Sequence, residues 1–186
     1  MTQSSAPDAY ASLTEPATLR LERLLPGSID RVWAYLTESD LRRQWMAAGV
    51  MDMRVGGTAD LVWRNNELTD PPGNKPEDFG DEHRMEIEIT ELDPPHRLGI
   101  TWGRTGGVTF ELEPVGDMVR FTVTHHRIPE HEMALNISAG WHAHIDVLAA
   151  RLAGEEPELF WDHWLALKAE YSKRLGARPD FVGEVR

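Results

Sequence analysis

The feature that most constrains the fold is a run of four segments between residues 81 and 126 in which apolar and polar residues alternate. These segments cover residues 81–92, 96–104, 107–114 and 117–126. Each connector is only two or three residues long, too short for the crossover that parallel strands need. Alternation gives every strand one apolar face and one polar face. The run therefore predicts an antiparallel meander with one buried face and one face in water.

Further strands and helices are predicted on both sides of this run. Strands are predicted at residues 17–25, 49–55 and 56–64, and helices at 28–38, 39–46, 136–153 and 157–175. Ser28 and Ser39 stand where they would cap the first two helices. The helix at 136–153 must cover the apolar face of the sheet, because none of the preceding elements is long enough to do so. The order of elements predicts an α+β domain.

The length of 186 residues suits one domain, and a hydrophobic content of 41% is typical of globular proteins. Residues 1–16 are rich in Ser, Ala, Pro and Thr, so we expect a disordered tail there. Residues 17–155 are predicted to form the folded domain. Residues 156–186 are predicted to add one helix and a second tail.

Charge and composition exclude several classes of function. The formal net charge of −12 repels phosphate backbones and anionic lipids, which argues against binding to nucleic acid or to a membrane surface. The chain has no cysteine, so disulfides, thiolate metal sites and a cysteine nucleophile are excluded. No signal peptide or membrane span is recognisable in the sequence, and we expect a cytoplasmic protein without a cofactor.

The helix at 136–153 has one apolar stripe that should face the sheet. A helix turns by about 100° per residue, which places five apolar side chains within roughly 40° of Trp141. The stripe consists of Ile137, Trp141, Ile145, Leu148 and Leu152. Ala143 lies on the opposite side of this helix, so we expect it to be exposed.

The histidines of the same helix do not form a metal site. His142 and His144 point about 160° apart around the helix axis, so one ion cannot bind both. His142 and Asp146 have the spacing of a surface pair along a helix. His131 stands between two glutamates in the connector before the helix, which is weak evidence for metal binding. The sequence therefore predicts no metal.

His125 is the more informative histidine, because it continues the inward phase of the last strand of the meander. A buried histidine at a strand end is more often structural than catalytic. The complete set of side chains predicted to point inward, and so to line a cavity if one exists, is Leu61, Trp63, Met85, Ile87, Trp102, Phe110, Phe121, His125, Trp141, His144 and Ile145. The same set would also describe a filled core.

Several stretches of the chain resemble a known family when taken together and in order. They are "IDRVWAYLTESDLRRQWM", "GGTADLVW", "EITELDPPHRLGITWG", "VTFELEPVG…VRFTVTHHRIP" and "SAGWHAHIDVLAARLAG". These stretches are similar to bacterial relatives of the activator of the heat-shock-protein-90 ATPase, in the START/Bet v-like superfamily also called SRPBCC. The resemblance covers about residues 17 to 155.

The resemblance implies the helix-grip fold, in which a curved antiparallel sheet wraps a long C-terminal helix and two small helices fill one end. It also implies an apolar cavity between the sheet and that helix, which relatives use for hydrophobic ligands. It implies no shared catalytic motif. The predicted helix at 157–175 is an addition to this pattern. Its apolar face would pack on the domain, cap the cavity or pair two subunits in a homodimer.

Three functions follow as alternatives. The first is binding of a small hydrophobic molecule in the cavity. The second is an enzyme of the cyclase, hydratase or hydrolase type, for which His125, His144 and Arg104 are the candidate polar groups. The third is a co-chaperone-like interaction module, as the family name suggests.

Overall fold

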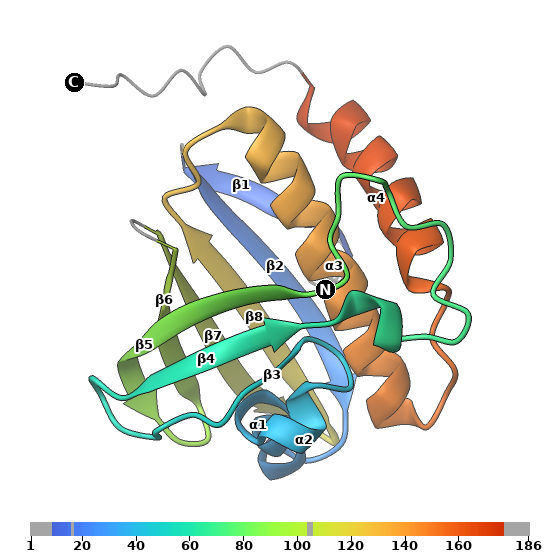
Figure 1. Cartoon of the computed structure of the whole chain (residues 1–186). Coiled ribbons are helices and arrows are strands. Elements are labelled where there is room, and N and C mark those ends of the chain that lie inside the picture. Colours follow the sequence, from blue (N-terminus) through green and yellow to red (C-terminus); the bar gives the residue numbers. More distant parts are fainter. Residues whose placement is uncertain (1–8, 16, 104–105, 177–186) are drawn as a thin grey trace, which may run out of the picture.

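The computed structural model describes residues 9–15, 17–103 and 106–176, and it contains one curved antiparallel sheet that holds a long helix (Figure 1). The strands are β1 (Ser12–Glu15), β2 (Thr18–Pro26), β3 (Ala47–Ala48), β4 (Thr58–Trp63), β5 (His83–Asp93), β6 (Arg97–Trp102), β7 (Gly106–Val115) and β8 (Met118–His126). The helices are α1 (Ile29–Thr37), α2 (Ser39–Arg42), the 3-10 turn η1 (Asn65–Glu67), α3 (His131–Ala153) and α4 (Phe160–Leu175).

The eight strands pair in the order β1-β2-β8-β7-β6-β5-β4-β3, so β3 to β8 form a meander of consecutive neighbours. The sheet curves around α3, and α1 and α2 close one end (Figure 1). Ser28 caps α1, as predicted, by accepting a hydrogen bond from the backbone N–H of Arg31. This is the helix-grip arrangement, and the predicted α+β fold class is confirmed.

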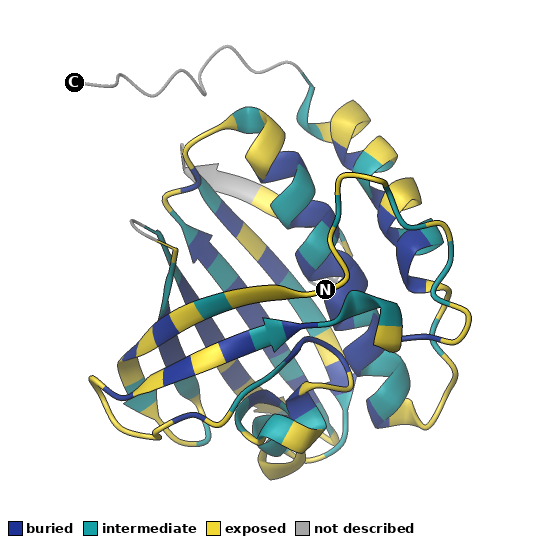
Figure 2. Cartoon of the chain, viewed as in Figure 1, coloured by how far each residue is buried: buried dark blue, intermediate teal, exposed yellow. Residues whose placement is uncertain are grey.

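The inward phase of the central strands is also as predicted. Val108 pairs with His125 and Phe110 pairs with Val123 across β7 and β8, and all four side chains are buried. Burial alternates along β4 and β5 in the same way (Figure 2). The apolar face of the sheet therefore forms the floor of the core beneath α3.

The predicted strand at residues 49–55 is wrong, because this segment is a loop and β3 is only the preceding two residues. Gly49 has a φ of 130°, and a Cβ there would lie 2.3 Å from the carbonyl oxygen of Asp60. A positive φ and this close approach are incompatible with a regular strand of L-residues. The alternating Val and Met residues of this segment have the spacing expected of a strand, although its backbone turns.

α3 is longer than predicted. It begins at His131, so that this histidine lies in the first turn of the helix rather than in a connector. It ends as predicted at Ala153, where Gly154 adopts a left-handed conformation with a φ of 73°.

The expectation that Ala143 is exposed is wrong, because Ala143 is completely buried. The phase of α3 is nevertheless as predicted. Trp141 faces the sheet, with its ring 5.6 Å from that of Phe110. Ala143 lies on the other side, where it shares a groove with Phe160 and His163 of α4. α4 covers the face of α3 that the sequence pattern assigned to solvent.

α4 packs on its own domain. Of the three positions predicted for its apolar face, packing on the domain is the one observed, since Trp161 and Trp164 are both buried within the single chain. The segment between β4 and β5 runs beside α4 (Figure 1), and Asn66 accepts a hydrogen bond from the indole N–H of Trp161. Phe79 of the same segment packs its ring 5.0 Å from that of Trp164.

The N-terminal segment is more ordered than predicted within its described part. Residues 12–15 form β1 against β2, which corrects the expectation of a disordered tail for these residues. The backbone N–H of Ala11 donates to the hydroxyl of Tyr171 in α4. Residues 1–8 and 16 of the predicted tail lie outside the described residues.

Candidate functional site

A cavity of about 110 Å³ lies between the sheet and α3, at the place where the sequence analysis expects one. It is lined by Met46, Trp63, Trp102, Ile137, Gly140, Trp141 and His144. Trp102, Ile137 and Gly140 are half-buried, whereas the other four are buried. The mouth of the cavity therefore lies between the end of β6 and the first turns of α3.

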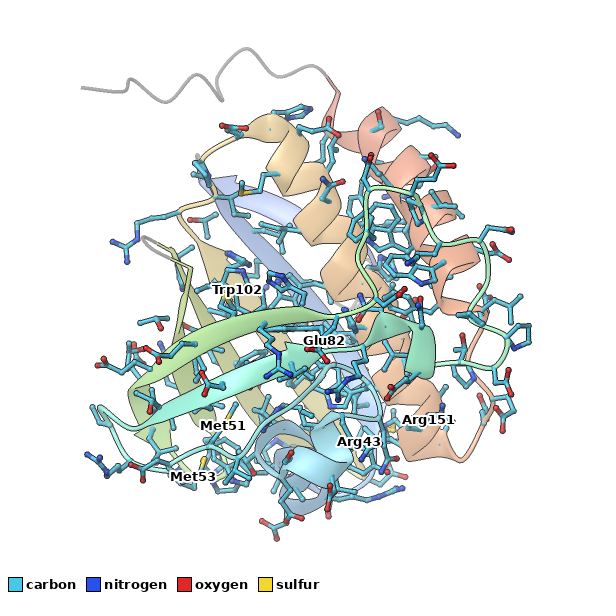
Figure 3. All side chains as sticks on the ribbon, viewed as in Figure 1. Arg43, Met51, Met53, Glu82, Trp102 and Arg151 are labelled. Atoms are coloured by element: carbon cyan, nitrogen blue, oxygen red, sulfur yellow. The ribbon has the colours of Figure 1, made fainter. Side chains whose placement is uncertain are left out.

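Aromatic rings dominate the walls, and Trp102 is at their centre. Its ring centroid lies 5.6 Å from that of Trp63, 5.3 Å from that of Trp141 and 5.3 Å from that of His125. Trp63 comes from the end of β4, Trp102 from the end of β6 and Trp141 from α3. Figure 3 shows Trp102 in the space between the sheet and α3.

His125 supports this cluster from behind. Its Nδ1 accepts a hydrogen bond of 3.1 Å from the indole N–H of Trp141. Nδ1 is therefore unprotonated, and the neutral ring carries its proton on Nε2. Burial lowers the pKa of His125 to about 4, so the ring is neutral at pH 7. The inward orientation predicted for His125 is confirmed, and it fixes the plane of the Trp141 indole.

His144 is the one titratable residue among those lining the cavity. Its Nδ1 donates a hydrogen bond of 2.6 Å to the backbone carbonyl of Trp45, and its ring packs 4.9 Å from that of Phe160. Burial lowers the pKa of His144 to about 4, although the carbonyl of Trp45 opposes this. The cavity is thus bordered by a neutral imidazole that is fixed by the backbone.

The structure divides the eleven predicted cavity residues into three groups. Four line the cavity: Trp63, Trp102, Trp141 and His144. Five are packed in the filled core: Leu61, Ile87, Phe110, Phe121 and Ile145. His125 lies behind Trp141, and the half-buried Met85 accepts a hydrogen bond at its sulfur from the backbone of Gly103.

Three lining residues were missed by the sequence analysis. Ile137 had been assigned to the stripe of the long helix but not to the cavity. Gly140 precedes Trp141 by one residue and, having no side chain, has no periodic signal of its own. Met46 was the last residue of the helix predicted at 39–46, but α2 ends at Arg42, so helical spacing gave no direction for the Met46 side chain. Arg104, a candidate polar group of the enzyme hypothesis, lies outside the described residues.

A second cluster of polar side chains lies on the other side of α3. Asp146 accepts from His163 at 2.8 Å, contacts His142 at 3.3 Å and pairs with Arg23 of β2 at 2.8 Å. The predicted pair of His142 and Asp146 is present, but His142 is buried rather than exposed. Its Nδ1 lies 3.0 Å from the hydroxyl of Tyr171.

These contacts fix the charges of the cluster. Burial raises the pKa of Asp146, but hydrogen bonds from His142 and His163 and the charge of Arg23 outweigh it, so the pKa lies well below its usual range. The second nitrogen of His163 lies 2.9 Å from Glu158. Both nitrogens of His163 thus face carboxylates, and the hydrogen bond to Asp146 raises its pKa. The cluster ties α3, α4 and β2 together.

A groove of about 460 Å³ borders this cluster, with Ala143, Val147 and Ala150 on its α3 side and Phe160 and His163 on its α4 side. Glu155, Glu156 and Glu158 also line it. It is larger than the cavity beneath α3. The groove nevertheless lies outside the space between the sheet and α3, where the resemblance places the ligand.

In residues 9–15, 17–103 and 106–176 no group of three His, Asp or Glu side chains could hold a metal ion. Among the same residues, no helix is both long and apolar enough to pass through a bilayer.

Comparisons with known proteins agree with this architecture. The profile of the family described as "Activator of Hsp90 ATPase homolog 1-like protein" matches residues 26–153. The solution structure of the protein encoded by gene BPP1335 from Bordetella parapertussis is 34% identical, with a TM-score of 0.75, and the match covers 94% of this chain and 95% of that chain. A search of curated proteins gave no match.

Two further structures share the fold at lower identity. CalU16 from Micromonospora echinospora is 18% identical with a TM-score of 0.64, and the match covers 86% of this chain and 89% of that chain. DynU16, from the dynemicin biosynthetic locus, is 21% identical with a TM-score of 0.61. That match covers 77% of this chain and 49% of DynU16.

Proposed function

The chain belongs to the family of proteins like the activator of Hsp90 ATPase homolog 1, and on this premise we propose that it binds a small hydrophobic molecule in the cavity between the sheet and α3. The observation that carries the proposal is the wall of three tryptophans, Trp63, Trp102 and Trp141, around a space of about 110 Å³. Aromatic side chains with few polar groups are the usual lining of ligand pockets.

The volume limits what the ligand can be. An apolar cavity of roughly 150 Å³ accommodates benzene, whereas pockets for larger ligands measure about 300–1,000 Å³. The cavity of about 110 Å³ is smaller than both, so it suits at most a single ring or a compact branched group. A larger ligand would insert one end and leave the rest at the mouth beside Trp102 and Ile137.

The chemistry of the lining favours binding over catalysis. His144 is the one titratable lining residue, and its Nδ1 is already bound to the carbonyl of Trp45. The Nδ1 of His125 is likewise occupied, by the indole of Trp141. A cyclase, hydratase or hydrolase would need a general acid or base within reach of the substrate. Among the lining residues Nε2 of His144 is the nitrogen left for that role, and burial lowers the pKa of this ring to about 4, which makes it a weak base at pH 7.

Gly140→Ala provides the sharpest test of the site. A Cβ at this position would meet Trp164 Nε1 at 4.0 Å and no other described atom within 4 Å outside the backbone of α3. Replacing glycine by alanine inside a helix stabilises a protein by about 0.5–1 kcal/mol. Because Gly140 lines the cavity, we expect the added methyl group to reduce the space available to a ligand. We expect a higher melting temperature together with weaker ligand binding.

The measurement is a titration with single-ring aromatics such as toluene and with short fatty acids, followed by tryptophan fluorescence and by melting temperature. Ser172→Ala, on the exposed side of α4, is the matched control that alters helix propensity far from the cavity. It should leave affinity unchanged. Equal affinities of the wild type and Gly140→Ala for every ligand that binds would place binding elsewhere, and no binding of any compound would refute the proposed function.

A further inference from the structure

The lining of the cavity is rich in tryptophan and carries no charge. Three of the seven lining residues are tryptophans, and none of the seven carries a formal charge at neutral pH. We infer that the cavity binds a fully alkylated ammonium group, such as the trimethylammonium end of a small organic cation. This inference rests on the proposed function and narrows its ligand class.

The arrangement of the indoles supports a cage rather than a stack. The planes of Trp63 and Trp102 are inclined by 72°, and those of Trp102 and Trp141 by 49°. The centroid of Trp102 lies 5.6 Å from that of Trp63 and 5.3 Å from that of Trp141, so Trp102 packs against both rings and the three meet at different angles. Indole presents the most favourable aromatic face to a cation, and the attraction increases when the cation is removed from water.

No positive charge in the lining opposes such a group. His144, the one basic residue there, has its Nδ1 fixed on the carbonyl of Trp45, and the ring is neutral. The whole chain carries a formal net charge of −12, which raises the local concentration of cations around the protein.

The scarcity of acceptors in the lining decides which cation fits. A primary ammonium has three N–H donors, each of which must find an acceptor when it is buried. Met46, Ile137 and Gly140 offer no side-chain acceptor, and Nε2 of His144 could accept from only one of the three donors. A fully alkylated ammonium has no N–H donor, so burial leaves no hydrogen bond unmade. Its compact branched shape also suits a space of about 110 Å³.

The test compares two probes of the same shape, choline and 3,3-dimethyl-1-butanol, which differ in the charge of one central atom. Their dissociation constants are measured by calorimetry on the full-length protein. Sodium chloride at about 0.3 M screens unspecific attraction of choline to the acidic surface. We expect choline to bind at least about tenfold more tightly than the neutral alcohol.

Trp102→Leu and Trp102→Phe identify the source of this preference. Trp102 is only half-buried, which makes it the wall residue best suited to replacement. The leucine variant should bind both probes equally, and the phenylalanine variant should regain part of the preference for choline. Melting curves verify that both variants remain folded.

The two proposals fail in different ways. Equal affinity of the wild type for both probes, or a preference that survives Trp102→Leu, would overturn the ammonium inference and leave the hydrophobic cavity intact. Failure of both probes, together with failure of the aromatic and fatty-acid ligands, would overturn the proposed function as well. A preference for choline that disappears in Gly140→Ala and Trp102→Leu would support both.

Discussion

At the scale of single residues, Arg42 has the most unusual environment in the described part of the chain. It is fully buried, and its guanidinium group donates to four backbone carbonyls rather than to a carboxylate. Two of these carbonyls, those of Leu36 and Thr37, are in the last turn of α1, where helices leave acceptors without partners. Burial lowers the pKa of Arg42 to about 10, so it remains charged at pH 7.

We predict that Arg42→Met destabilises the protein by more than about 3 kcal/mol, because several buried carbonyls lose their only side-chain donor. Arg42→Lys should not restore stability, since one ammonium cannot reach the same four oxygens. Arg43→Met is the control, because Arg43 is the exposed neighbour (Figure 3) and its loss should change stability by less than about 0.5 kcal/mol. Urea unfolding measures all three, and similar effects at both positions would contradict this role.

The buried histidines His125 and His144 should make the protein less stable in acid. Burial lowers the pKa of both His125 and His144 to about 4, against about 6.5 in an unfolded chain. Between these values the unfolded chain binds protons that the folded protein excludes, so stability falls as the pH decreases from about 6.5 to 4. Each histidine should contribute at most about 2 kcal/mol of loss at pH 5.

The double variant His125→Gln/His144→Gln removes both groups. We expect it to be less stable than the wild type at pH 7.5, because hydrogen bonds to Trp141 and Trp45 are disturbed. Its stability should also decrease less between pH 7.5 and 5, as urea unfolding at each pH would show. Parallel pH profiles of the two proteins would mean that the histidines are not responsible.

For His163 we predict the opposite pH dependence of folding stability. Its pKa is raised chiefly by the hydrogen bond to Asp146, so its contribution to stability is complete below about 6.5 and disappears as the pH rises through the folded value. Asp146, Glu158, His142 and Arg23 are the charged or titratable groups around it. His163→Gln should therefore destabilise the protein more at pH 6 than at pH 9. A deficit that grows toward pH 9 would contradict the assigned charge.

At the scale of secondary-structure elements, α4 is the part of the chain that most changes the surroundings of α3. It buries Phe160, Trp161, Trp164, Leu167 and Tyr171 against the rest of the domain. Its N-terminus is held by the segment between β4 and β5, where Pro72 accepts from the backbone N–H of Trp161. The polar cluster around Asp146 holds the first turn of α4 through His163, and the backbone N–H of Ala11 holds Tyr171 near its C-terminal end.

We predict that Trp161→Ala lowers stability by about 3–5 kcal/mol, as for other large buried side chains. Truncation after Gly154 should lower the melting temperature further, because it also exposes the face of α3 that contains Ala139 and Ala143. Neither change should turn a dimer into a monomer on a sizing column, since the apolar face of α4 is already covered by its own chain. Loss of a dimer without loss of thermal stability would contradict this packing.

The elements also show where sequence reasoning succeeded and failed. Periodicity located the four strands of the meander and the phase of α3, because one face of each is buried and the other is not. Ala143 was misplaced because the pattern of one helix does not reveal that a second helix covers its polar side. Residues 49–55 were assigned to a strand because their alternating Val and Met residues have the spacing of a strand. Hydrophobic spacing does not reveal that the backbone turns at Gly49 and Gly56, where φ is positive.

At the scale of the whole molecule, the helix-grip fold was predictable from the order of elements together with the family resemblance. The cavity was not predictable in the same detail. Inward phase does not distinguish a packed side chain such as Phe110 from a wall such as Trp102, because both point into the same space. The difference arises from volume that the seven lining residues leave unfilled, and unfilled volume gives no periodic signal in a sequence.

The central claim, a ligand site walled by Trp63, Trp102 and Trp141, is tested most directly by nuclear magnetic resonance of the seven tryptophan indole N–H groups. During titration with a ligand found by fluorescence, the signals of these three residues should shift together and saturate. Those of Trp33 in α1 and of Trp161, which is bound to Asn66, should remain in place. Saturable shifts at Trp33 or Trp161 with the three wall residues unmoved would contradict the claim.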